Sequence, residues 1–318
     1  MYKYILFLGW FILKTPFLFA NVAKDSSTVI ESQLVLKTKS GNIYGTLTTP
    51  ADTKGVPIAL IISGSGPSDR DGNNPFMKND CLKQLAHQLA EHDIASLRYD
   101  KRGIGESKDA GKNEADLRFD DYVNDAKQWI ELLSHENKYS KIIVIGHSEG
   151  SLIGMMAGRN ADQFVSISGE GQPADKILKE QLSKQPQVVQ DLSFPIIDTL
   201  KNGKLVDNVN PMLNALFRPS VQPYLISWFK YDPQEEIKRL KIPILILQGT
   251  NDLQVSVQDA ERLHAANPNS KLVILDNMNH ILKKVSGDRQ ENIASYTNRE
   301  LPIDKELVEN IASFVLTK

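Results

Sequence analysis

The most constraining feature of this 318-residue chain is a serine between two glycines, placed directly after an apolar run. Residues 141–145 read Lys-Ile-Ile-Val-Ile, which is typical of a buried β-strand, and Gly146-His-Ser-Glu-Gly150 follows at once. Residues 151–157 then continue as a helical pattern. A Gly-x-Ser-x-Gly sequence in this setting predicts a strained strand-to-helix turn with the serine Oγ exposed above a sheet. Ser148 is therefore a candidate nucleophile. Because a bare Gly-x-Ser-x-Gly match also arises by chance, this assignment depends on the residues around the motif.

Strand-like and helix-like segments alternate along most of the chain, which predicts βαβ units and an α/β fold with a mostly parallel central sheet covered by helices on both faces. The first two strands are expected to form an antiparallel hairpin around residues 40–42. The predicted strands are residues 29–37, 43–48, 56–62, 94–99, 141–145, 164–167, 242–247 and 271–275. The predicted helices are residues 79–91, 119–133, 151–157, 257–266 and about 305–316.

One long segment, residues 172–240, interrupts this alternation. It has polar helical patterns and scattered prolines but no convincing strand. Segments this long between two strands are uncommon unless they have a function. We therefore predict a helical cap that is inserted into the domain and lies over the carboxyl edge of the sheet.

Composition and charge narrow the class of protein. The chain is 41% hydrophobic and 24% charged, as expected of a globular protein. Its formal net charge is −2 and it has no basic block, which argues against nucleic acid as a partner. The single cysteine, Cys81, excludes an internal disulfide and is expected to be a small core residue. The sequence carries no signal of an oligomeric state.

The N-terminus differs from the rest of the chain. A short basic start, an apolar run and the small residues Ala20 and Ala23 are typical of a secretory signal peptide over residues 1–23. Lys14 makes the apolar run shorter than the roughly 20 residues that a membrane-spanning helix needs. We therefore predict an exported protein, periplasmic or secreted, whose domain comprises residues 24–318. The alternative is a retained N-terminal membrane anchor.

A serine nucleophile needs a general base and an orienting carboxylate. Open α/β sheets build such sites where strands end. Of the six histidines, only His280 lies in a loop directly after a late strand. Asp252 follows another buried strand and is the preferred acid, with Asp276 and Glu170 as alternatives. We predict that Asp252 orients His280.

An oxyanion formed on the substrate needs hydrogen-bond donors. One is expected to be the backbone N–H of Glu149, the residue after the candidate nucleophile. The other is expected from the glycine-rich loop after strand 56–62, where Ser65 N–H is preferred and Gly64 is the alternative. This loop has neither the dinucleotide-binding glycine pattern nor a phosphate-binding P-loop sequence, so no nucleotide cofactor is expected.

Four motifs together resemble the α/β-hydrolase superfamily. More narrowly, they are similar to those of bacterial exported esterases with a serine-aminopeptidase-like domain of the S33 type. The resemblance covers roughly residues 29–317 and departs from the family at Ser151, where relatives often carry a second glycine. It implies a Ser-His-Asp hydrolase that needs neither cofactor nor metal. The motifs are Ser63-Gly-Ser-Gly-Pro-x-Asp-Arg-Asp-Gly, Asp100-x-Arg-Gly-x-Gly-x-Ser107, Gly-His-Ser-Glu-Gly and Met278-Asn-His-Ile-Leu-Lys283.

The predicted function is hydrolysis of a small acyl ester through an acyl-enzyme on Ser148. Glu149 and Glu170 could instead attract a substrate amine, which keeps an aminopeptidase of short peptides as an alternative. A thioesterase and a non-catalytic binding protein are further alternatives. Gly64, Glu170 and the cap residue Trp228 are the candidate substrate contacts, although aromatic residues in such segments more often form the core of the cap.

The motif around Asp100 is interpreted as structural. Asp100 and Arg102 are expected to form a turn in which Arg102 fixes nearby loops.

Overall fold

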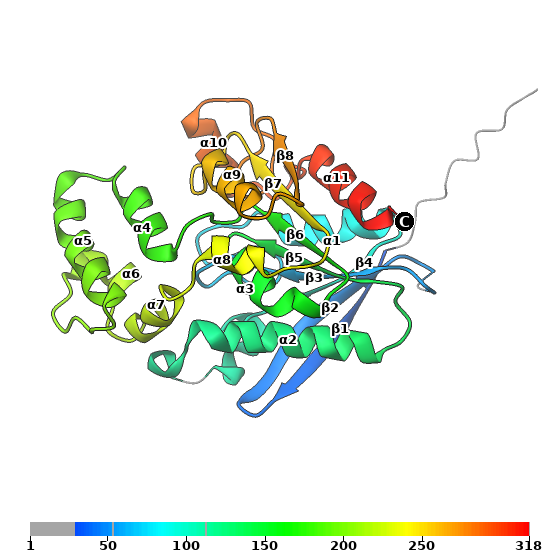
Figure 1. Cartoon of the computed structure of the whole chain (residues 1–318), viewed down its shortest axis with the longest axis horizontal. Helices are drawn as coiled ribbons and strands as arrows, with labels where there is room; N and C mark the ends of the chain where they lie inside the picture. The colour runs from blue at the N-terminus through cyan, green and yellow to red at the C-terminus, as the bar shows by residue number, and fades with distance from the viewer. Residues whose placement is uncertain (1–28, 53, 112, 318) are drawn as a thin grey trace, which may run out of the picture.

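The computed structural model describes residues 29–52, 54–111 and 113–317, so the predicted signal segment at residues 1–23 lies outside the described residues. Within this part, eight strands form one sheet in the order β1-β2-β4-β3-β5-β6-β7-β8 (Figure 1). The strands are β1 (Ile30–Thr38), β2 (Gly41–Thr49), β3 (Ile58–Ile62), β4 (Ala95–Tyr99), β5 (Ile142–His147), β6 (Gln163–Ile167), β7 (Ile244–Gly249) and β8 (Lys271–Leu275).

The sheet is mostly parallel, as the sequence predicts. β1 and β2 form the expected antiparallel hairpin, and β2 also pairs antiparallel with β4. From β4 to β8 all neighbouring strands are parallel. The carboxyl ends of these strands therefore meet at one edge of the sheet, where open α/β sheets bind their ligands.

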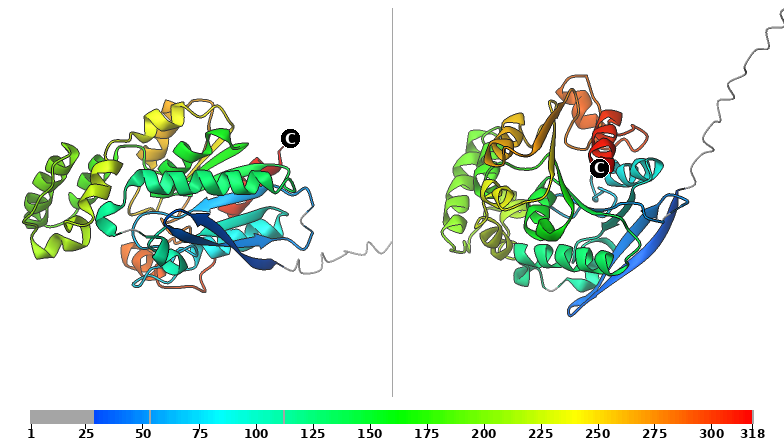
Figure 2. Two further views of the ribbon diagram at one scale, coloured as in Figure 1. Left: turned by 90° about the horizontal axis from the view of Figure 1, so that it is seen from below. Right: turned by 45° about the vertical axis from the view of Figure 1, so that its right-hand side comes forward.

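Helices cover both faces of the sheet (Figure 2). On one face lie α1 (Cys81–Glu91) and α11 (Lys305–Leu316), which contact each other. On the other face lie α2 (Phe119–His135), α3 (Glu149–Ala157), α8 (Pro233–Lys238) and α9 (Val257–Ala266). Cys81 is buried at the start of α1, as expected for a core residue.

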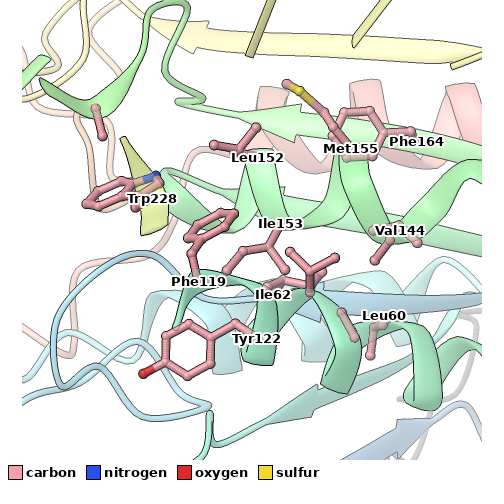
Figure 3. Close-up of a cluster of buried hydrophobic side chains, with 14 of the residues drawn as sticks. Leu60, Ile62, Phe119, Tyr122, Val144, Leu152, Ile153, Met155, Phe164 and Trp228 are labelled. Atoms are coloured by element: carbon pink, nitrogen blue, oxygen red, sulfur yellow. The ribbon is translucent and has the colours of Figure 1, made fainter. Parts of the chain in front are cut away.

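β3 explains why the central strands are apolar along their whole length. Ile58, Leu60 and Ile62 belong to one core cluster, whereas Ala59 and Ile61 belong to the cluster on the other face. All five are at most 1% exposed, because alternate side chains of a strand point to opposite faces. Figure 3 shows Leu60 and Ile62 within the first cluster. Each fully buried aliphatic side chain of this kind contributes about 1.5–3 kcal/mol.

The segment between β6 and β7 is helical and is called the cap segment below, defined as residues 172–240. Figures 1 and 2 show α4 to α7 as a group beyond one end of the sheet. α8, the last helix of the segment, returns to pack on α3 and α9. The remaining helices of the segment are α4 (Ala174–Leu182), α5 (Gln187–Lys201), α6 (Asn214–Phe217), α7 (Gln222–Trp228) and the 3₁₀ turn η4 (Pro211–Leu213).

Some boundaries differ from the sequence expectation. α1 begins at Cys81 rather than at residue 79, because Asp80 has φ 52° and so cannot continue a right-handed helix. Helix α10 (Arg289–Ser295) was not predicted.

None of the helices in the described ranges is long and apolar enough to cross a membrane. The short 3₁₀ helices are η1 (Gly105–Ala110), η2 (Glu114–Asp116) and η3 (Gly158–Asn160).

Candidate active site

Ser148 lies at the tight turn between β5 and α3. Its φ of 55° and ψ of −125° are a strained combination that residues with a Cβ rarely adopt. A Cβ on Gly146 would lie 2.3 Å from the carbonyl oxygen of Gly150, and a Cβ on Gly150 would lie 2.3 Å from that of Ile62. Both positions therefore require glycine, and the strained turn expected from the sequence is present.

Asp252 and His280 come together at the same edge of the sheet. Asp252 follows β7, and His280 follows the neighbouring strand β8. His280 Nδ1 lies 2.8 Å from Asp252 Oδ2, and both side chains are buried. Because Asp252 occupies Nδ1, His280 Nε2 remains the ring nitrogen that can exchange a proton with another group.

The Asp252 carboxylate is held as an anion by several donors. Its Oδ1 accepts the backbone N–H groups of Gln254 and Val255, at 2.8 and 3.0 Å. Its Oδ2 also accepts Gln248 Nε2 at 3.2 Å. Burial opposes ionisation, but the electrostatic interaction and the hydrogen bond with His280 outweigh it, so the pKa of Asp252 lies below its usual value. Asp252 is thus an ionised partner fixed in position.

His147 connects the turn at Ser148 to the loop of His280. Its Nε2 lies 2.8 Å from the His280 carbonyl oxygen, and the two imidazole rings are 4.8 Å apart. Burial and the nearby His280 lower the pKa of His147 to about 3, so its ring is neutral. Because a carbonyl only accepts, Nε2 carries the ring proton. The residue before Ser148 therefore contacts both the main chain and the ring of His280.

The loop after β3 lies against the turn at Ser148. A Cβ on Gly64 would lie 3.0 Å from the Cβ of Ser148. Ser65 follows and is exposed, while Glu149 is the first residue of α3, where backbone N–H groups have no partner within the helix. The two segments expected to supply the oxyanion donors, those of Ser65 and Glu149, are thus adjacent.

Lys101 is a residue of this region that the sequence interpretation missed. Its Nζ donates to the Gly64 carbonyl oxygen at 2.6 Å and to Glu149 Oε2 at 3.0 Å. The side chains of Lys101 and Glu149 are each 1% exposed. The hydroxyl of Tyr224, from α7 of the cap segment, donates to the other carboxylate oxygen of Glu149. Lys101 follows β4 at the carboxyl edge, and the reasoning that located Asp252 could have found it.

Glu170 and Trp228 are buried rather than open to solvent. Glu170 is 6% exposed, and its Oε2 has no hydrogen-bond partner among the described residues. Burial, together with the nearby charges of Glu149 and Asp259, raises the pKa of Glu170 to about 8. The indole ring of Trp228 stacks on Phe119 of α2 with centroids 6.0 Å apart, so it packs the cap segment against the body of the domain (Figure 3).

The turn after β4 is structural, as interpreted from the sequence. Asp100 accepts the backbone N–H and the guanidinium of Arg70, both at 2.7 Å. Arg102 forms a buried ion pair with Asp125 of α2, and its Nε lies 2.7 Å from Asp125 Oδ2. The contacts of Asp100 join the turn to the loop after β3, whereas the ion pair of Arg102 joins it to α2.

No group of three or more His, Cys, Asp or Glu side chains that could hold a metal ion occurs in the part of the chain that the structure describes.

The sheet order, the helices on both faces and the serine on a strand-to-helix turn are those of the α/β-hydrolase fold. Residues 78–191 match the family model described as serine aminopeptidase, S33. The chain is 27% identical over 287 residues to Esterase EstD of Thermotoga maritima. That match covers 86% of this chain and 65% of the relative, so the chain spans about two thirds of its length.

Solved structures of low sequence identity share the fold. Est1E from Butyrivibrio proteoclasticus is 16% identical with a TM-score of 0.58, and the match covers 90% of this chain and 99% of that one. The Pyrococcus furiosus esterase Pf2001 is also 16% identical, with a TM-score of 0.56 and coverage of 90% of each chain.

Proposed function

We propose that this protein is a serine hydrolase that cleaves carboxylic esters through an acyl-enzyme on Ser148. The observation that carries the proposal is the hydrogen bond between His280 Nδ1 and Asp252, at the edge of the sheet where the strained turn presents Ser148. The similarity to Esterase EstD supports an ester as the substrate.

The proposed reaction follows from the roles of these groups. His280 Nε2 takes the proton of Ser148 Oγ as the serine attacks the acyl carbon, and it then protonates the leaving alcohol. Asp252 keeps the ring in the required tautomer and stabilises the imidazolium. The N–H groups of Glu149 and Ser65 stabilise the oxyanion, each worth about 10²–10³ in turnover. Water, activated by the same histidine, then releases the acid.

The charges around the site favour an ester over a free-amine substrate. An aminopeptidase needs an ionised carboxylate that is free to pair with the substrate ammonium. The Glu149 carboxylate is already bound by Lys101 and Tyr224. Glu170, with a pKa of about 8, is mainly uncharged at neutral pH. Neither carboxylate offers a free negative charge, so the aminopeptidase alternative is disfavoured.

The direct test is a hydrolysis panel of p-nitrophenyl acyl esters of graded length, acyl thioesters and aminoacyl amides with a free amine. Ser148→Ala is the matched control, because it removes only the nucleophilic oxygen. We expect the esters to be cleaved fastest, with Ser148→Ala inactive. Faster cleavage of the amides or of the thioesters would replace the ester assignment. Cleavage of none of them would favour a binding protein.

We also propose that the protein is exported. The support is the sequence of residues 1–23, with its basic start, apolar run and small residues before the domain. Mass spectrometry of the N-terminus, after expression in a bacterium with a periplasm, tests this proposal. A mature N-terminus close to residue 24 in the periplasmic fraction is expected, whereas an intact chain in the membrane fraction would indicate an anchor.

A further inference from the structure

The buried ammonium of Lys101 contacts both segments that are proposed to form the oxyanion hole, the loop after β3 and the start of α3. It donates to the Gly64 carbonyl oxygen at 2.6 Å, on the loop after β3. It also donates to the carboxylate of Glu149 at 3.0 Å, on the first residue of α3. Lys101 lies 37 residues from Gly64 and 48 from Glu149 in the sequence, so the fold alone creates this bridge.

The contact with Gly64 fixes the orientation of one peptide plane. The carbonyl of Gly64 and the N–H of Ser65 belong to the same peptide group. In a planar trans peptide these two groups point in opposite directions. A carbonyl held toward Lys101 therefore turns the Ser65 N–H away from Lys101. Rotation of this plane would replace a donor at the hole by a carbonyl oxygen, which repels an oxyanion.

The contact with Glu149 fixes the other side of the hole. The Glu149 side chain is held by Lys101 through one oxygen and by Tyr224 through the other. Its backbone N–H is the second proposed donor, and it belongs to the same residue. Because both charged side chains are 1% exposed, neither can exchange its partner for water. One buried lysine thus connects the residue that carries one proposed donor with the peptide that carries the other.

We propose that Lys101 is a positioning residue that holds the Ser65 and Glu149 N–H groups in place to stabilise the oxyanion. The inference rests on the proposed serine hydrolase function. It predicts that loss of Lys101 weakens binding of the tetrahedral intermediate much more than binding of the substrate.

The test compares two lysine variants with a matched control. Lys101→Met removes both contacts but leaves the Glu149 carboxylate buried with only Tyr224. The double variant Lys101→Met with Glu149→Leu removes both charges, so that no unpaired charge is left buried, and it does not restore the hydrogen bond to the Gly64 carbonyl oxygen. Arg102→Met is the control, because it breaks the neighbouring buried ion pair to Asp125, which does not contact the oxyanion loop.

The readouts are kcat and KM for p-nitrophenyl butyrate, the melting temperature, and the inhibition constant of an alkyl trifluoromethyl ketone, which forms an oxyanion on the serine. For both lysine variants we expect kcat to fall by roughly 10²-fold and the inhibition constant to rise about as much. We expect KM to stay within about threefold, as for loss of an interaction made only in the transition state.

The outcomes separate positioning from simple stabilisation. Arg102→Met is expected to lower the melting temperature while kcat stays within about threefold of the original. Recovery of kcat and of inhibitor affinity in the double variant, or no loss of them in Lys101→Met, would overturn the inference. If Lys101→Met does not fold, the double variant decides. An original protein that cleaves no ester would refute the proposed function, and the inference would fall with it.

Discussion

Replacing Glu170 by glutamine is expected to change how stability depends on pH. The Glu170 side chain is buried beside the site, and burial with the nearby charges of Glu149 and Asp259 raises its pKa from 4.5 to about 8. In the unfolded chain the carboxyl regains the ordinary value. The folded protein therefore binds this proton more tightly than the unfolded chain does.

The size of the effect follows from proton linkage. The contribution of protonated Glu170 to the free energy of unfolding is fully present below about pH 4.5. It is lost as the pH rises toward about 8, the pKa of Glu170 in the folded protein. In this window each pH unit changes the free energy of unfolding by about 1.4 kcal/mol. From pH 5 to pH 9 the loss amounts to roughly 4 kcal/mol. Glutamine has nearly the same shape and does not titrate, so Glu170→Gln removes this loss.

Urea unfolding of the original protein and of Glu170→Gln at several pH values measures the effect. The difference in free energy of unfolding, original minus variant, is expected to fall by roughly 4 kcal/mol from pH 5 to pH 9. Glu261→Gln is the control, because it removes a carboxylate from an exposed position on α9. If the Glu170→Gln difference stayed constant from pH 5 to pH 9, the Glu170 carboxyl would not be held protonated in the folded protein.

Two further substitutions test the geometry of the site. Gly64→Ala places a Cβ 3.0 Å from the Cβ of Ser148, so the loop or the serine must move by a few tenths of an ångström. We expect kcat/KM for p-nitrophenyl butyrate to fall by about tenfold or more with little change in melting temperature, and unchanged kinetics would contradict the close approach. Asp252→Asn keeps the shape of the acid but loses its charge beside His280, and we expect kcat to fall by roughly 10⁴-fold. A loss of less than tenfold would show that Asp252 is not the acid of the site.

The parts of the fold predicted from sequence are those set by local pattern. Continuous apolar runs predicted the parallel strands, and the glycines around Ser148 predicted the strained turn. Asp252 and His280 could be selected because each follows a strand, and parallel strands bring their carboxyl ends to one edge.

The parts that sequence did not predict depend on contacts between distant segments. Lys101 could be placed at the carboxyl edge because it follows β4, but its contacts with Gly64 and Glu149 form only when distant segments are assembled, and its motif indicated only a structural turn. The pKa of Glu170 is raised because the folded chain buries this carboxyl, which no local pattern reveals. Trp228 was a candidate substrate contact, but the helix that carries it packs against α2, so the ring stacks on Phe119.

The central claim, that Ser148 is the nucleophile of a serine hydrolase, is tested most directly with a fluorophosphonate probe and mass spectrometry. An activated serine forms a stable phosphonyl adduct, whereas an ordinary serine does not. We expect a single adduct on the peptide that contains Ser148, no adduct in Ser148→Ala, and slower labelling in Asp252→Asn. An unlabelled protein, or an adduct on any other serine, would contradict the claim.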